Sequence, residues 1–389
     1  MVLVVAVALT LVAAYAFRVA WLELKASGSR MRAVQAAEAA DSGLVWALAR
    51  FNDERPIDSA CRPAAAGTTF RERYLGGPSM PSCAFDGETW ACSCPASGTA
   101  VATATMTLAT DVARQAFALQ LSLAASGVTT VGAIGCSGAL TGCLSPAGQA
   151  VPAQTHVARA WADVARIPAI DARPVAAITA RGTLQLRDGP TVVHHGIASG
   201  GLTLHAGAGI DPGDAMLVGP PGAPPRSTLV GGDAVLGSLD ATQFFASVFR
   251  MDKAAWRTQP AAQVMDCTTP CDDALVERLA PTGAPSLVWL DGGLRLNGAA
   301  ELGSPARPVL LVVDGAVHLR GPVRIHGVLY LRSADWRDEA GADIRGALLA
   351  ENDLLLAGPT RIEHDASIVE RLQRCCGTYA RLPGSWRDF

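Results

Sequence analysis

The sequence predicts an α+β chain with a long N-terminal helix, a small αβ-roll-like region and a C-terminal β-rich region that forms a short β-helix. Three observations predict this fold class. Residues 1–17 are apolar and run on into a helical pattern, short aliphatic runs between Gly turns recur from 286 to 360, and many of the 10 cysteines lie in close pairs. We expect domains at 1–52, 53–180 and 181–389.

The composition argues against two broad classes of protein. With 32 Lys and Arg against 35 Asp and Glu the formal net charge is -3, so no nucleic-acid partner is predicted for the folded part. Charged residues make up 17% of the chain, against roughly 25% in typical soluble domains. Much of the apolar fraction is Ala, which buries little area per residue. A large, conventionally packed enzyme core is therefore not favoured.

The first 17 residues are suited to enter a membrane. They carry no charged side chain before Arg18. As a helix they rise about 26 Å, just under the roughly 30 Å of a bilayer's hydrocarbon core. Val19 to Leu22 would complete the span, with Arg18 reaching toward the headgroups. We assign the anchor to Val2, Leu3, Val4, Val5, Val7, Leu9, Leu11, Val12, Tyr15 and Phe17.

A cleaved signal peptide and a buried core helix are the alternatives for this segment. Ala14-Tyr15-Ala16 offers an A-x-A cleavage site, but a basic n-region is absent. Neither Gly nor Pro follows Ala16 before Gly28, and helix-forming residues continue almost to Asn52. We therefore expect one helix of roughly 50 residues, about 75 Å long, with Gly28 as its weak point.

The second half of this helix shows an apolar stripe at spacings of three and four, which predicts packing on a globular head. The stripe consists of Val34, Ala37, Ala40 or Asp41, Leu44, Leu48 and Phe51.

The segment QAAEAADSGLVWALARF, Gln35 to Phe51, resembles the N-terminal motif of type IV pilus minor pilins, the pilus assembly proteins of the PilX type. Further along, FF-x-x-x-F followed by Trp and paired cysteines resembles the family's C-terminal half. LVWLDGGLRLNG, PVLLVVDGAVHLRG and the terminal PGSWRDF resemble its C-terminal β-rich region. The resemblance thus touches both ends of the chain, while residues 53–180 match only in character.

This resemblance implies a role in filament assembly. Val2 to Phe17 would anchor the unassembled subunit in the inner membrane and then pack with other pilins in the filament. The head would lie in the periplasm and then at the cell surface. Implied partners are other pilins, the assembly machinery and, as an option, a ligand at the tip; adhesion, twitching motility and DNA uptake stay open. Prepilins carry a short basic leader, so we expect either a start codon upstream of Met1 or a chain without that leader.

The cysteines indicate an oxidising compartment and hence export. The pairs Cys136/Cys143 and Cys267/Cys271 suit short disulfide-closed loops, while the adjacent Cys375 and Cys376 stay without assigned partners. From Asp53 to about Ser97 we expect a loop-rich connector stapled by disulfides. A zinc knuckle at Cys92-Ser93-Cys94 is the alternative, disfavoured because a second pair at matched spacing is missing.

Three histidines, His194, His195 and His205, invite a metal site within a region of β-prone runs. No Asp, Glu or Cys completes the group at a convincing spacing, so we interpret them as surface or strand-edge residues. Ser238 to Cys267 predicts a helical insertion near 238–266 with an aromatic side.

The repeats of the C-terminal region predict stacked coils. Ile325 recurs as Ile344 and Ile362, and Gly327 recurs as Gly346. Spacings of about 20 residues favour a β-helix or solenoid, with a β-sandwich or meander as the alternative. Ser367 to Gln373 predicts a capping helix that begins at Ser367.

An enzyme is the competing class, because β-helices can carry clustered carboxylates and basic residues. Candidates are Asp314, Asp335, Asp338, Arg320 and Arg324, but nothing fixes two carboxylates at about 5 to 9.5 Å. The sequence also contains no G-x-S-x-G elbow, no H-E-x-x-H helix and no dinucleotide-binding fingerprint. We assign no catalytic, cofactor or metal residue and expect a non-enzymatic minor pilin. The alternatives are an exported β-helical carbohydrate-binding or carbohydrate-active protein and a secretion-system pseudopilin.

Overall fold

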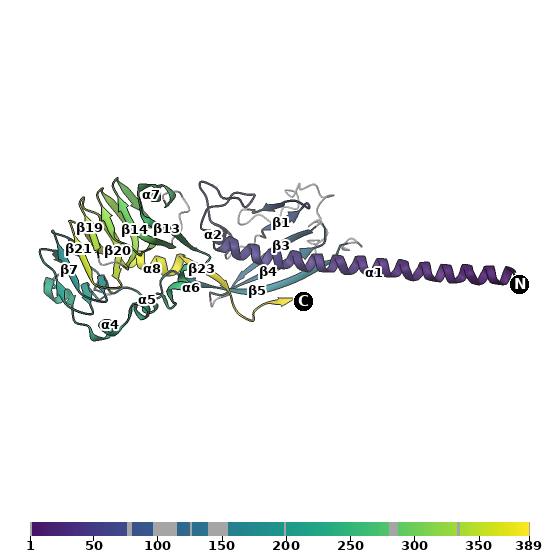
Figure 1. The fold of residues 1–389 in the computed structure, drawn as a ribbon, viewed down its shortest axis with the longest axis horizontal. Helices are drawn as coiled ribbons and strands as arrows, with labels where there is room; N and C mark the ends of the chain where they lie inside the picture. Colours follow the sequence, from purple (N-terminus) through teal and green to yellow (C-terminus); the bar gives the residue numbers. More distant parts are fainter. Residues whose placement is uncertain are drawn as a thin grey trace. The chain divides into compact units, whose positions relative to one another are not determined.

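The computed structural model describes residues 2–388 apart from 76–79, 96–114, 125–126, 139–154, 198–199, 280–286 and 333–334. Two compact units are present (Figure 1). The first comprises Met1–Phe51, Ile57–Ala165 and Ala380–Phe389, and the second comprises Asn52–Pro56 and Arg166–Tyr379. We expected a boundary at 180, but the chain divides near 165, and its last residues return to the first unit.

α1, Val2–Phe51, is one continuous helix of 50 residues, as predicted. Alanine and long aliphatic residues dominate it, and it contains no proline. Gly28 lies within the helix without breaking it. The apolar segment and the part bound to the first unit's sheet therefore belong to the same helix.

The C-terminal part of α1 packs on a sheet of the first unit through small residues. Ala36 and Ala40 are buried, and Gly135 approaches them so closely that a Cβ on it would lie 2.1 Å from the carbonyl oxygen of Ala36. A Cβ on Gly43 would lie 3.0 Å from the ring of Phe117. Helix and sheet are thus close enough that Gly and Ala are the residues that fit.

The predicted apolar stripe is wrong at its N-terminal end. Val34 and Ala37 are exposed, whereas Ala40, Leu44 and Phe51 are buried as expected. The contact face is set by close backbone approach, and a hydrophobicity pattern gives little weight to the Ala and Gly residues that permit it.

The sheet of the first unit has the strand order β2-β1-β3-β4-β5-β23, with β24 also paired to β5. Strands β1 to β5 pair antiparallel. The alternating pattern of the sequence predicts strands over 105–108 and 116–123, and β3 confirms the second, while 105–108 lies outside the described residues. The segment 156–170 fits either a strand or a helix by its sequence, and most of it forms β5. The elements are α2 (Phe70–Tyr74), β1 (Ser82–Phe85), β2 (Trp90–Ser93), β3 (Gln115–Leu123), β4 (Thr129–Cys136), β5 (Val157–Pro168), β23 (Gly377–Arg381) and β24 (Arg387–Asp388).

The second unit is a stack of parallel strands in three columns around a common interior (Figure 1). The first column contains β13 (Ala262–Cys271), β14 (Leu287–Leu296), β16 (Val309–Val313), β18 (Val323–Leu331), β20 (Asp343–Ala350), β6 (Ala176–Ala180), β9 (Leu202–Ala206) and β12 (Leu229–Val230). The second column adds β17 (Val317–Leu319), β19 (Asp335–Asp338), β21 (Leu354–Ala357), β7 (Leu184–Arg187) and β10 (Ile210–Asp211). The third adds β15 (Ala300–Leu302), β22 (Arg361–His364), β8 (Thr191–Val193) and β11 (Met216–Val218).

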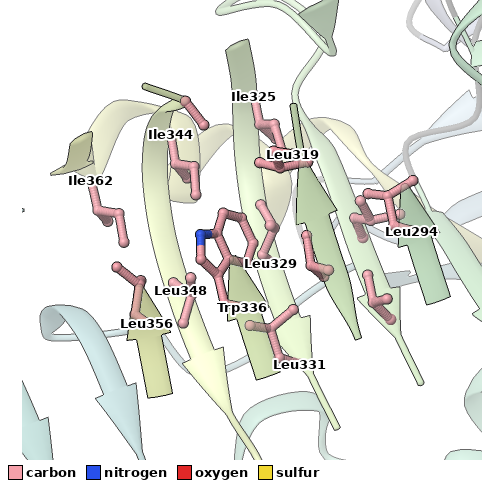
Figure 2. Packing of buried hydrophobic residues seen from close by; sticks show 14 of the residues in the cluster. Leu294, Leu319, Ile325, Leu329, Leu331, Trp336, Ile344, Leu348, Leu356 and Ile362 are labelled. Carbon is pink, nitrogen blue, oxygen red and sulfur yellow. The ribbon is translucent and has the colours of Figure 1, made fainter. Parts of the chain in front are cut away.

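This parallel stack is β-helix-like, as predicted, and it contradicts the sandwich or meander alternative, whose strands would pair antiparallel. Ile325, Ile344 and Ile362 are paired in register and point into the interior (Figure 2). Trp336 lies in the neighbouring ladder, between Val317 on one side and Leu356 on the other. The predicted coil repeat is therefore confirmed residue by residue.

The coils do not follow one another in sequence order. β20, β21 and β22 pair with β6, β7 and β8, so the coils of 287–364 are continued in space by those of 176–230. The chain enters the stack at β6, runs outward to β12, passes through helices and starts again at β13. We call the contact of β20–β22 with β6–β8 the seam.

The first column is apolar on both sides. Its inner side lines the common interior, while its outer side, with Trp289 and Tyr330, packs on the helices. The helical insertion is confirmed, but residues 262–266 belong to β13. The covering helices are α4 (Ala234–Ser238), α5 (Ala241–Phe249), α6 (Lys253–Arg257) and α8 (Ala366–Cys375).

The two ends of the stack are finished differently. At the β13 end, α7 (Asp273–Leu279) buries Leu275 and Leu279 in the interior. At the other end, β10 and β12 are two residues long, and a short strand limits edge pairing. The capping helix α8 begins at Ala366, not at Ser367 as expected, and Asp365 caps it by accepting from the amides of Ser367 and Ile368.

Candidate functional site

The candidate functional site is the apolar half of α1, before Arg18. Its described side chains are exposed, and the exposed fractions of its large apolar side chains range from 50% at Val7 to 78% at Leu3. The side chains of Val2 and Val4 lie outside the described part. The other predicted anchor residues all belong to the exposed set: Leu3, Val5, Val7, Leu9, Leu11, Val12, Tyr15 and Phe17.

This segment is apolar around its whole circumference. Successive helical residues are turned by about 100°, so Leu11, Val12 and Phe17 point in three directions that are about 100° or more apart. All three are 65–75% exposed. The hydroxyl of Thr10 donates to the carbonyl oxygen of Val7 at 2.8 Å, so its polar atom is satisfied within the helix. A helix that is apolar all round is typical of burial in protein or lipid.

Aromatic and charged residues mark the end of the apolar segment. Arg18, directly after this segment, is the first charged residue of α1. Further along, the Lys25 ammonium lies 4.5 Å from the centre of the Trp21 ring. Tyr15 and Trp21 are exposed, and aromatic residues near charges are typical of a membrane-water interface. Within the described part of the chain, α1 is the one helix whose length and composition would let it cross a bilayer.

Disulfides close loops in both units. Cys61 pairs with Cys94 and Cys83 pairs with Cys92. Cys92 and Cys94 thus serve two different disulfides, which contradicts the zinc-knuckle alternative. Both disulfides lie within residues 61–94, in the disulfide-stapled region expected after Asp53. Disulfides are typical of an oxidising, non-cytoplasmic location.

The remaining cysteine predictions have mixed outcomes. Cys267 and Cys271 form a disulfide. Cys136 takes part in a disulfide as well, and so does Cys376. Cys143 and the side chain of Cys375 lie outside what the structure describes. The sequence analysis missed the two disulfides at 61–94 and 83–92, although the crowding of cysteines between 83 and 94 was a signal for them.

The structure separates the three histidines that invited a metal hypothesis. His205 lies 2.8 Å from the carboxylate of Asp233, and this hydrogen bond lowers the pKa of that carboxyl. His195 is exposed, while His194 is buried and stacks on His364. The described residues contain no group of three or more His, Cys, Asp or Glu side chains placed to hold a metal ion. The pair of His194 and His364 could not be found from sequence, because the seam brings them together.

The carboxylates considered for catalysis have partners in the fold. Asp338 is buried and accepts from the amides of Ala340, Gly341 and Ala342. Asp314 pairs with Arg332 at 2.7 Å.

The other candidates are also paired. Asp335 lies 3.3 Å from Arg337, Arg320 lies 3.5 Å from Glu339, and Arg324 lies 3.6 Å from Asp343. Asp338 thus caps a turn through backbone amides, and the other four candidates form ion pairs.

A buried carboxylate that the sequence analysis missed is Glu351. It accepts hydrogen bonds from Lys253 at 2.7 Å and from the hydroxyl of Tyr330 at 2.9 Å. Burial raises the pKa of Tyr330, which keeps this hydroxyl protonated as a donor. The group ties helix α6 to the first column of the stack.

Comparison with protein-family models, with curated proteins and with solved structures gave no match to this chain.

Proposed function

We propose that this protein is a non-enzymatic, membrane-anchored minor pilin that takes part in type IV pilus assembly. The apolar half of α1 holds the subunit in the inner membrane and then packs against the helices of other pilins. The head lies in the periplasm before assembly and is displayed on the filament afterwards. A position at the tip would suit adhesion, with twitching motility and DNA uptake as further roles.

The observation that carries this proposal is the exposure of an uncharged, apolar segment that continues into a helix packed on a sheet. Fully burying one Val, Leu or Phe contributes about 1.5 to 3 kcal/mol. Transfer of the exposed set to lipid or protein would therefore contribute on the order of 10 kcal/mol. The antiparallel sheet against α1 supports an αβ-roll-like head, and the paired carboxylates of the stack support a structural role.

Two helices in lipid gain no hydrophobic driving force from each other, so their association depends on packing. The segment is suited to close packing, because small and branched residues dominate Val2 to Ala16. The surrounding pilins in a filament would replace lipid as the apolar environment.

Alkaline extraction of membranes tests the anchor. A Leu11→Arg substitution places a charge in the middle of the apolar segment, which costs about 2.5 to 3.5 kcal/mol in a bilayer. We expect wild type to stay in the membrane pellet and Leu11→Arg to be reduced there. Val45→Arg is the matched control, because Val45 is 70% exposed on the same helix but outside the apolar segment. Equal retention of Leu11→Arg and wild type would contradict the proposal.

The second candidate is an exported β-helical protein that binds or acts on carbohydrate, favoured by the β-helix-like stack. In that case residues 1–16 would be removed on export. The mass of the mature N-terminus separates the two candidates.

A further inference from the structure

The seam joins two halves of the stack that are remote in sequence. In its third column β22 pairs with β8, and the amide of Thr191 donates to the carbonyl oxygen of Thr360 at 2.9 Å. Glu363 and Val193 are the last pair in register. His364 is the last residue of β22, and His194 comes directly after β8.

These histidines, His194 and His364, form a buried stacked pair. Their ring centres are 4.0 Å apart with an interplanar angle of 28°. His194 is fully buried and His364 is 8% exposed. The two rings therefore lie face to face across the seam, where little water can reach them.

The hydrogen bonds of the pair fix one proton on each ring, and each bond raises the pKa of its ring against the larger, opposite effect of burial. Nδ1 of His194 lies 2.6 Å from the carbonyl oxygen of Leu202, and Nε2 of His364 lies 2.9 Å from that of Pro174. A carbonyl oxygen only accepts, so each of these nitrogens carries a proton. Nδ1 of His364 is buried and has no hydrogen-bond partner among the described residues, so a second proton there would meet no acceptor.

The charges around the pair do not offset the cost of placing a second proton on these buried rings. Burial is the main cause that lowers the pKa of both rings, and His194 lowers the pKa of His364 further. His195 also disfavours a charge on His194, whereas Asp365 favours one on His364. The Asp365 carboxylate already accepts from the backbone of α8.

The other charges on these strands also have partners. Arg361 and Glu363 on β22 pair with each other at 2.9 Å. β8 itself, with the sequence Thr-Val-Val, contributes no titratable side chain.

We propose that the pair of His194 and His364 is an acid-sensitive latch that holds the seam closed while both rings are neutral and lets β8 and β22 separate when they are protonated. Two imidazolium rings stacked at 4.0 Å repel each other, and little solvent is present to screen their charges. Opening exposes both rings to water and removes the repulsion. The latch is independent of the proposed role of α1.

The sign of the pH dependence follows from linkage. A histidine with a lowered pKa in the closed state binds its proton more readily in the open state. The closed seam is therefore favoured above about pH 6.5, the ordinary histidine value, and loses stability as pH falls below it. Two rings that stay neutral when closed would shift the opening equilibrium by up to about 1,000-fold between pH 7.5 and 5.0, and one ring by about 30-fold.

Hydrogen exchange on the full-length protein in detergent tests the latch. Protection of the β8 and β22 peptides, corrected for the intrinsic exchange rate, is compared with that of β18 as the internal reference. We expect wild type to lose seam protection toward pH 5.0 while β18 keeps its protection. Unchanged seam protection in wild type would overturn the proposal.

Matched variants assign the effect to the two rings. The amide nitrogen of Asn can replace Nδ1 of His194, and that of Gln can replace Nε2 of His364. We expect His364→Gln to reduce the pH response to about that of one ring, and the double variant H194N/H364Q to abolish it. His205→Gln, which alters a histidine outside the seam, should retain the wild-type response. A full pH response in the double variant would contradict the latch.

A second measurement needs no variant. Exchange at the ring C2 position, read by mass spectrometry, gives the titration of each histidine in wild type. Both rings should titrate below about pH 6.5, and titration of either at or above that value would overturn the proposal.

Discussion

Arg181 donates a hydrogen bond from Nε to the carbonyl oxygen of Glu351 at 2.6 Å, across 170 positions of sequence. The same guanidinium donates to the carbonyl oxygen of Leu239 and to the side-chain oxygen of Asn352. One side chain thus joins the two halves of the stack at the seam and holds the segment that leads into α5. The coils meet out of sequence order, and specific contacts of this kind bind them together.

Replacement of Arg181 by Ala should destabilise the second unit by about 3 kcal/mol, because it removes charged hydrogen bonds and leaves carbonyl oxygens without a donor. Arg181→Lys should recover part of this loss, since an ammonium cannot match the fork of donors. Arg337→Ala, which truncates a largely exposed arginine paired with Asp335, should stay within about 0.5 kcal/mol of wild type. Urea unfolding followed by tryptophan fluorescence measures the free energies, and equal stability of the two Ala variants would refute the assignment.

Removal of the Trp336 side chain should cost about 3 to 5 kcal/mol, because it leaves a cavity in the interior of the stack. Trp336 is fully buried, and its indole nitrogen donates to the hydroxyl of Thr360 at 3.1 Å. Leu355→Ala is the control, since Leu355 lies on the adjacent strand β21 and is 40% exposed. Thermal unfolding compares them; a Trp336→Ala protein as stable as the control would show that the ladder in Figure 2 is not a packed core.

A methyl group on Gly135 should loosen α1 from the sheet. The added Cβ would lie 2.1 Å from the carbonyl oxygen of Ala36, so helix or strand must move, at a cost of about 1 to 3 kcal/mol. Gly138→Ala is the matched control, because its Cβ would meet Thr155 at 3.7 Å, an ordinary contact. Limited proteolysis of α1 near Ala36 reads the outcome. Equal cleavage of the two variants would rule out the close approach.

Two of the disulfides should differ in how much they stabilise the fold. Cys61 and Cys94 are 33 positions apart, whereas Cys267 and Cys271 are 4 apart. Chain entropy predicts about 4 kcal/mol for the longer loop and about 2 kcal/mol for the shorter one. Paired Cys→Ala variants, each measured by chemical denaturation, test this order, and a larger loss from the short loop would contradict the entropic account.

Sequence reasoning reached the parts of the fold that are local or repeated. The spacing of Ile325, Ile344 and Ile362 predicted the coils, because stacked strands put equivalent side chains into one ladder. The continuous helix followed from composition and the lack of proline. The capping helix and the helical insertion also followed, with boundaries off by a few residues.

The rest depended on contacts that a linear pattern does not contain. The seam places β6 beside β20 although the two are remote in sequence, and strand order in space is not encoded in repeat spacing. The N-terminal end of the α1 face that contacts the sheet was misjudged, because close backbone approach rather than side-chain size selected Ala36 over Val34. The apolar segment of α1 could be recognised from the sequence because the absence of charge is a local property, and its described side chains are exposed.

Under the proposed function the apolar half of α1 enters a filament. To test this, surface filaments are sheared from cells and separated from membranes, and the N-terminal mass of this protein is read in each pool. We expect the segment up to Phe17 to be intact in the sheared filaments as well as in the membrane. A soluble exported form that lacks residues 1–16, with none of the protein in filaments, would contradict it.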